Sequence, residues 1–152
     1  MAKSIKQRVL SLILVCISVF TMFSVSVSAV QAQAAEIATP YYNNVVTTDS
    51  TASISSSGKL TVRNSYDGED GVTTKAIITT YVEKKVLGLF WTRVDIGTTD
   101  DEWVDTIYDH VYTGSHSIQL SSEGTYRITV KYVVYGTGGA ADEIDWEFER
   151  EY

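Results

Sequence analysis

Two histidines and several carboxylates are the side chains in this sequence that could carry catalytic or metal chemistry. His110 and His116 fall on separate predicted β elements and have no cysteine partner, whereas a zinc site needs three or four ligands in a recognised spacing. A glycosidase needs only two carboxylates, but a β-domain of this size usually lacks the deep cleft that would desolvate them. The sequence also has no nucleophile elbow and no phosphate-binding glycine loop. We therefore predict no catalytic residues, no metal ligands and no cofactor, and expect that the protein is not an enzyme.

An acidic loop is predicted at residues 67–71, where Asp67, Glu69 and Asp70 stand close together. An EF-hand loop needs acids at alternating positions, an internal glycine and a distal glutamate, and this spacing is absent. We interpret the loop as a solvated turn, and the sequence leaves calcium binding by the acidic loops open.

The local feature that suggests binding is a run without any polar side chain, residues 86–91, here called the apolar tip. Gly88 is expected to turn the chain within it. Exposed apolar patches tend to mark interaction sites, but the tip could instead fold over one end of the domain and close its core. The candidate binding residues in the apolar tip are Leu87, Leu89, Phe90 and Trp91.

Aromatic side chains form an overlapping set of candidate binding residues. A glycan-binding surface would need exposed aromatic rings as platforms. The candidates for such platforms are Trp91, Trp103 and Tyr135. Burial of all three would argue against a glycan ligand.

These candidates must be positioned by β structure, whose clearest signal is the stretch 122–136. β-Branched and aromatic residues fill it, and residues two apart share one face of a strand. Its start resembles the tyrosine corner of immunoglobulin-like sandwiches, in which a tyrosine hydroxyl turns back onto the backbone a few residues upstream. The face that we assign to the core consists of Tyr126, Ile128, Val130, Tyr132 and Val134.

Further strands are predicted on both sides of this central one. Their ranges are 45–55, 59–66, 73–86, 90–96, 103–112 and 115–120 before it, and 143–151 after it. Thr113 and Gly114 are predicted to separate two of them. About seven to eight strands at this spacing predict an all-β protein, with an immunoglobulin-like antiparallel β-sandwich domain over residues 45–152. A jelly roll or a small barrel is the alternative.

The last predicted strand alternates without interruption between apolar and acidic residues. If it runs antiparallel to the central strand, the expected register places Lys131 opposite Glu147 and Arg127 opposite Glu151. Cross-strand pairs of opposite charge contribute roughly 0.2–1 kcal/mol each. The acidic stripe therefore has a structural explanation, and it protects an edge strand against aggregation.

Residues 1–34 have the pattern of an export signal rather than of a folded element. Three basic residues precede a long apolar segment, and small-residue cleavage sites follow at Ala29 and Ala34. We predict a signal peptide helix over 1–34, a leader over 35–44, and a secreted, extracellular protein. A retained membrane anchor is the alternative, because the apolar run is nearly long enough to span a bilayer.

Removal of this segment would leave an acidic domain without cysteine. The one cysteine, Cys16, lies within the apolar run, and the full chain carries a net charge of −7. Loss of three basic residues and no acidic residue changes the charge by −3, from −7 to about −10. We expect neither nucleic acid nor anionic lipid as a default partner, because both require basic patches. We also expect a monomer, with membrane contact only through the signal peptide unless the apolar tip inserts.

Lys84 and Lys85 precede Trp91 and Val94 in one predicted hairpin, and Gly124 to Arg127 open the central strand. This pattern is similar to that of a group of small secreted proteins of Gram-positive bacteria (Firmicutes). In that group a K-K…W-x-x-V hairpin precedes a G-T-Y-R strand in an immunoglobulin-like domain. The likeness covers most of residues 50–135 and implies the fold and secretion, but no activity, because none is established for the group. Leu87 and Leu89 depart from the pattern. The residues that carry the likeness are Lys84, Lys85, Trp91, Val94, Trp103, Gly124, Thr125, Tyr126 and Arg127.

These observations leave three functions open. The first is a secreted binding or adhesion module for the cell wall, a glycan or a protein partner. The second is a membrane-active, toxin-like protein that uses the apolar tip. The third is an accessory secreted protein without a ligand.

Overall fold

The computed structural model describes residues 42–152, and every regular element in this part of the chain is a β-strand. The predicted signal peptide and most of the predicted leader lie outside the described residues. All strand pairs are antiparallel, which confirms the predicted all-β antiparallel class. The strands are β1 (Val45–Ile54), β2 (Lys59–Gly68), β3 (Thr73–Val86), β4 (Phe90–Arg93), β5 (Glu102–Ile107), β6 (Val111–Gln119), β7 (Thr125–Gly136) and β8 (Asp142–Glu151).

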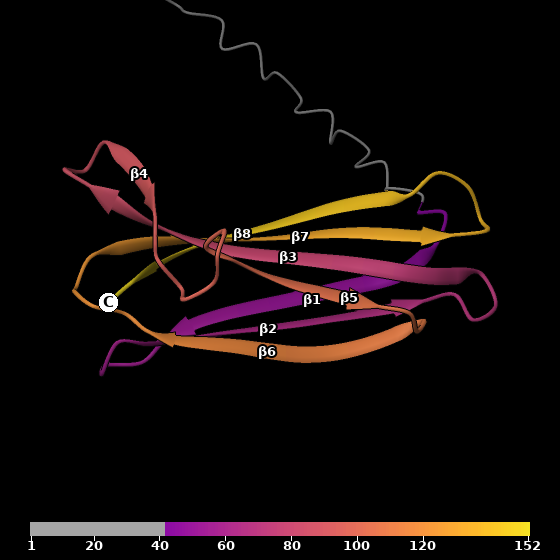
Figure 1. Ribbon diagram of the computed structural model, residues 1–152, viewed down its shortest axis with the longest axis horizontal. Helices are drawn as coiled ribbons and strands as arrows, with labels where there is room; N and C mark the ends of the chain where they lie inside the picture. Colours follow the sequence, from indigo (N-terminus) through magenta and orange to yellow (C-terminus); the bar gives the residue numbers. More distant parts are fainter. Residues whose placement is uncertain (1–41) are drawn as a thin grey trace, which may run out of the picture. The chain divides into compact units, whose positions relative to one another are not determined.

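The strands form two sheets that enclose one hydrophobic core (Figure 1). The smaller sheet has the order β1-β2-β6, and the larger has the order β4-β3-β7-β8. Strand β5 also pairs with β3, on the same edge as β4. Strand β4 lies against residues 83–86 of β3, and β5 lies against residues 76–81.

The core is built from the inward faces of the long strands. In β7 the side chains predicted for the core are at most 1% exposed, as the period-two pattern indicated. The Tyr126 hydroxyl donates a hydrogen bond to the carbonyl of Ser122, which is the contact predicted for a tyrosine corner. Within the described residues, the core thus consists of side chains from the strands and their connections, and β7 is central to it.

Two hydrogen bonds between buried side chains, Asn64–Thr80 and Ser50–Tyr132, join the sheets within this core. Asn64 of β2 donates from Nδ2 to the Thr80 hydroxyl of β3 at 3.1 Å. On the other side of Asn64, its Oδ1 accepts from the Ser50 hydroxyl of β1 at 3.2 Å. The Ser50 hydroxyl in turn lies 2.8 Å from the hydroxyl of Tyr132 in β7. These directional contacts fix how the two sheets are placed against each other.

The predicted strand over residues 103–112 is wrong in its second half. Strand β5 ends at Ile107 and β6 begins at Val111, because the chain crosses there from the larger sheet to the smaller one. The predicted break at Thr113 and Gly114 is also wrong, since both lie inside β6. The Tyr112 ring covers Gly114 so closely that a Cβ atom there would collide with it.

Three smaller predictions also need correction. The predicted strand over 90–96 ends at Arg93, and β2 continues through Asp67 and Gly68, which were predicted as loop. In the β7–β8 pair, Lys131 faces Asp145 and Arg127 faces Glu149, two residues from the predicted register. A shift by two residues leaves each side chain on the same face, so the charge pattern cannot distinguish the two registers.

Candidate functional site

The apolar tip is the turn of the β3–β4 hairpin, which extends past the neighbouring strands at the left of Figure 1. The Leu89 amide donates to the Val86 carbonyl at 3.1 Å, and Leu87 (φ 53°) and Gly88 (φ 70°) are both left-handed. This is the geometry of a type I′ turn, in which Asn-Gly or Gly-Gly is the usual pair. A left-handed conformation costs an ordinary L-residue about 1–2 kcal/mol. The leucine at position 87 therefore does not serve the stability of the turn.

The side chains of the apolar tip point into solvent instead of closing the core. The exposed fractions are 85% for Leu87, 75% for Leu89 and 63% for Phe90, and Val86 is 41% exposed. The possibility that the tip covers one end of the domain is therefore wrong for these residues. Four apolar side chains on one hairpin end form the kind of contiguous exposed patch that marks an interaction site.

Trp91, the last residue of the apolar tip, lies at its base beside two basic residues. In the hairpin register Val86 faces Phe90, and Lys85 faces Trp91. The Trp91 ring lies on the outer face of the larger sheet, with Lys85 Nζ 5.3 Å and the Arg127 guanidinium 4.5 Å from its centre. Cations this close to an indole face are attracted by its quadrupole. Trp91 is therefore held in a fixed position at the base of the tip.

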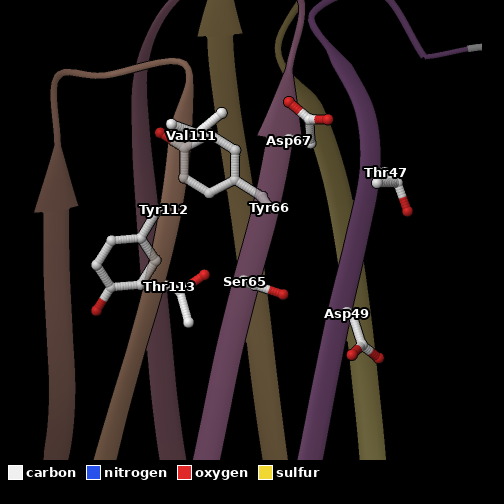
Figure 2. Close-up of a pocket in the computed structure, with 8 residues that line it drawn as sticks. All are labelled: Thr47, Asp49, Ser65, Tyr66, Asp67, Val111, Tyr112 and Thr113. Atoms are coloured by element: carbon white, nitrogen blue, oxygen red, sulfur yellow. The ribbon is translucent and has the colours of Figure 1, made fainter.

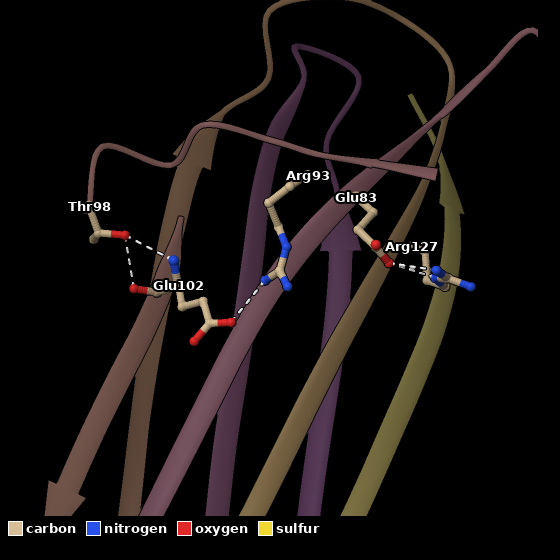
Figure 3. Close-up of polar contacts among 5 residues, drawn as sticks. All are labelled: Glu83, Arg93, Thr98, Glu102 and Arg127. Atoms are coloured by element: carbon tan, nitrogen blue, oxygen red, sulfur yellow. Dashed lines mark hydrogen bonds and ion pairs between the residues drawn. The ribbon is translucent and has the colours of Figure 1, made fainter. Parts of the chain in front are cut away.

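Two of the four cations near the hairpin are neutralised by carboxylates (Figure 3). Arg127 donates from Nη2 to Glu83 at 2.6 Å, and a second bond from its Nε is 2.9 Å long. The hydrogen bond to Glu83 raises the pKa of Arg127, and it outweighs the opposing effect of burial. Arg93 pairs with Glu102 at 3.2 Å, and the Thr98 hydroxyl holds the backbone of Glu102.

The other two cations, Lys84 and Lys85, form no ion pair within the described residues 42–152. Lys84 Nζ donates to the Ser122 hydroxyl at 2.6 Å and to the Glu123 backbone carbonyl at 2.8 Å, which are neutral acceptors. A groove of about 440 Å³ lies beside Lys84, and its lining also includes Val86, Arg93 and Asp95. The hairpin end thus combines an apolar tip with two cations that have no carboxylate partner in the described residues. Because they are adjacent in β3, the side chains of Lys84 and Lys85 leave opposite faces of the strand.

The predicted aromatic platforms do not come together. Trp91 stands opposite Lys85 at one end of β3, whereas Tyr135 stands opposite Lys75 near the other end. A separation of ten residues along a strand is roughly 33 Å. Trp103 is half-buried on the inner side of β5, where it stacks on His116 with a centroid distance of 5.0 Å. Tyr135 is 36% exposed and has the Lys75 ammonium 4.3 Å from its ring centre.

The two histidines contact different aspartates, His110 near Asp109 and His116 near Asp105. His116 Nε2 lies 2.7 Å from Asp105 Oδ2, so this pair joins the facing edge strands β6 and β5. His110 lies in the connection before β6 rather than on a predicted strand. Burial first, and then Asp105, raise the pKa of Tyr112 to about 12. Among residues 42–152 no group of three metal-ligating side chains converges.

A second hollow, of about 420 Å³, lies on the smaller sheet (Figure 2). Neighbouring strands line it with hydroxyl and carboxylate groups, and none of the predicted site residues is among them. It is open to solvent, and its charged lining residues are Asp49 and Asp67, the latter from the predicted acidic loop. The lining residues are Thr47, Asp49, Ser65, Tyr66, Asp67, Val111, Tyr112 and Thr113.

One buried carboxylate escaped the sequence reasoning. Asp142, at 5% exposure, accepts hydrogen bonds from the backbone amides of Asn43, Asn44 and Val45. Asn44 is also buried, and its side-chain amide donates from Nδ2 to the Ala140 carbonyl at 2.8 Å. These contacts tie the last residues of the predicted leader to the β7–β8 connection. The only sequence signal was an acid at an inward position of the alternating β8 pattern.

No protein-family model matches this chain, and no curated protein matches it. Among the described residues, no helix is long and apolar enough to cross a membrane.

Proposed function

We propose that this chain is an exported binding module built on an immunoglobulin-like sandwich, and that the apolar tip is its docking element. The strand orders support the fold: β1-β2-β6 and β4-β3-β7-β8 correspond to strands A-B-E and C′-C-F-G of that family. The tyrosine-corner hydrogen bond of Tyr126 agrees with the assignment of β7 as strand F. The export signal belongs to the proposal, since residues 1–34 lie outside the described part.

The observation that carries the proposal is the exposed, left-handed Leu87 at the centre of the apolar tip. A turn selected for stability would place Asn or Gly there and polar residues around it. Full burial of one leucine or phenylalanine side chain contributes about 1.5–3 kcal/mol. Leu87, Leu89 and Phe90 forgo this contribution in the isolated domain, and a partner that covers them would recover it.

Glycan binding through aromatic platforms is less well supported by the geometry. A sugar chain would need several rings on one surface, but Trp91 and Tyr135 lie near opposite ends of β3 and Trp103 lies between the sheets. The docking function therefore centres on the tip residues Leu87, Leu89, Phe90 and Trp91.

The experiment is co-sedimentation of the chain from residue 35 onward, which contains every described strand, with cell-wall sacculi and with lipid vesicles in parallel. The tip variant is Leu89→Asn, and the matched control is Tyr108→Asn, which removes an aromatic residue that is 78% exposed away from the hairpin. We expect the tip variant to lose binding and the control to keep it. Equal binding by both variants and the parent to every surface would contradict the proposal.

A further inference from the structure

We infer that the partner of the apolar tip is an anionic lipid surface, into which the tip inserts as a shallow wedge. This inference rests on the proposed function and names the chemistry of its partner. Two observations support it. The first is the order of residue types along the hairpin, and the second is the positive charge of Lys84 and Lys85 at its base.

The hairpin is layered by residue type. Leu87 and Leu89 form the end, the Val86–Phe90 pair follows, and the Lys85–Trp91 pair comes next. Each layer along a strand rises by about 3.3 Å, so the apolar part reaches roughly 7 Å beyond the Lys85–Trp91 pair. Peripheral elements bury their apolar faces about 5–10 Å into the boundary between headgroups and acyl chains. The length of the apolar tip matches that depth.

The Lys85–Trp91 pair has the chemistry of a membrane interface. Indole rings gather at the level of the headgroups, and lysine side chains extend their ammonium groups toward water and phosphate. Trp91 is fixed there between Lys85 and Arg127, as its cation–ring distances of 5.3 Å and 4.5 Å show. A pocket on a protein would cover an apolar side chain without requiring this sequence of layers.

Charge selects an anionic surface over a neutral one. Glu83 and Glu102 neutralise Arg127 and Arg93, and Glu147 Oε2 also lies 4.0 Å from Arg127 Nε. Lys84 and Lys85 are the cations at this end that have no carboxylate partner within the described residues. Asp95 lines the same groove as Lys84 and partly offsets it. The chain as a whole carries a net charge of −7, so the two lysines stand out against an acidic background. The hairpin is therefore the end that an anionic bilayer would attract.

The test is binding of the chain from residue 35 onward to phosphatidylcholine vesicles with and without phosphatidylglycerol, and to sacculi. Removal of two surface cations should weaken binding to the anionic vesicles by roughly 30-fold, at about tenfold per 1.4 kcal/mol. The double variant Lys84→Gln/Lys85→Gln removes the hairpin charge, and Lys59→Gln/Lys75→Gln removes two cations elsewhere. We expect the first to lose the preference for anionic vesicles and the second to keep most of it.

The outcomes separate this inference from the proposed function. Binding that depends on Leu89 but is equal for neutral and anionic vesicles, or is confined to sacculi, overturns the inference and leaves the proposed function standing. Binding that is unaffected by Leu89→Asn on every surface overturns both. Thermal unfolding of each variant checks that it is folded, and Leu87→Asn serves as a second tip variant because its turn geometry suits asparagine.

Discussion

The hydroxyl of Tyr132 in β7 lies 2.8 Å from the hydroxyl of Ser50 in β1, and this hydrogen bond joins the two sheets inside the core. The Tyr132 hydroxyl is also 2.9 Å from the Asp49 carbonyl. When Tyr132 donates to Asp49, the Ser50 proton is shared between Tyr132 and Asn64 Oδ1, because each hydroxyl has a single proton. Together with the Asn64–Thr80 contact, the Tyr132–Ser50 contact makes the centre of the sandwich directional rather than merely apolar. The orientation of the sheets, and with it the position of the β3–β4 hairpin, depends on these contacts.

The first prediction concerns the Asn64–Thr80 hydrogen bond. Thr80→Val leaves the buried Asn64 amide without this acceptor, and we expect a loss of about 1–3 kcal/mol in the free energy of unfolding. The double variant Thr80→Val/Asn64→Leu should recover part of the loss, because no unpaired amide remains. Urea denaturation of the two single variants and the double variant measures this coupling. Strictly additive losses would show that the contact does not stabilise the core.

The second prediction concerns alkaline pH. Burial raises the pKa of Tyr132 to about 12, and that of Tyr112 is raised to about 12 as well. Tyrosine in the unfolded chain titrates near 10. The folded state therefore keeps protons that the unfolded state loses, so the full stability is present below pH 10 and decreases as the pH rises toward 12.

Thermal unfolding across this range checks the alkaline prediction. Tyr132→Phe lowers the stability at neutral pH by removing hydrogen bonds, but it should also make the decrease between pH 10 and 12 less steep. A slope identical to that of the parent protein would mean that Tyr132 is not one of the groups responsible.

The third prediction concerns the Asp142 carboxylate. It accepts from the Asn44 amide at 2.6 Å, from Asn43 at 2.8 Å and from Val45 at 3.1 Å. Asp142→Ala should lower the free energy of unfolding by on the order of 3 kcal/mol, because buried donors lose a charged acceptor. Asp142→Asn keeps one acceptor oxygen, so its free energy of unfolding should lie between that of the parent protein and that of the alanine variant. Urea denaturation gives this order, and an alanine variant as stable as the parent would refute it.

The fourth prediction concerns the strained turn. Leu87→Asn places at position 87 a residue that accepts φ 53° at low cost, so the domain should gain about 1 kcal/mol in stability while losing an apolar contact with its partner. Chemical denaturation and vesicle co-sedimentation measure the two effects. A variant that is less stable than the parent would show that Leu87 contributes to the fold, contrary to its exposure.

Much of the fold could be predicted because the β7 and β3 strands obey the period-two pattern on their buried faces. The strand crossing at residues 108–110 could not be predicted, since Tyr108 continues the β-rich composition while Asp109 and His110 change sheets. A Gly in a strand reads as a break, and the Tyr112 ring over Gly114 helps to explain why the strand continues. The pairing of Gly114 with Asn64 of β2, fifty residues earlier, also keeps the strand continuous, and this contact has no signature in local sequence.

The apolar tip could be identified from sequence, but its role could not. A run such as residues 86–91 has the same composition whether it closes a core or faces solvent. The left-handed Leu87 and the pairing of Lys85 with Trp91 distinguish a tip that faces solvent from one that closes a core. These two features depend on the register of β3 with β4. The Asp142 network was missed because its partners lie about a hundred residues earlier in the chain.

The most direct test of the docking account is the environment of the tip when the partner is present. The chain from residue 35 onward has no cysteine, so Leu89→Cys can carry a single environment-sensitive fluorophore, and Ser117→Cys on the exposed face of β6 serves as the control. The account predicts that anionic vesicles shift the emission at position 89 to shorter wavelength and leave position 117 unchanged. Unchanged emission at position 89 on a surface that the protein binds would contradict it.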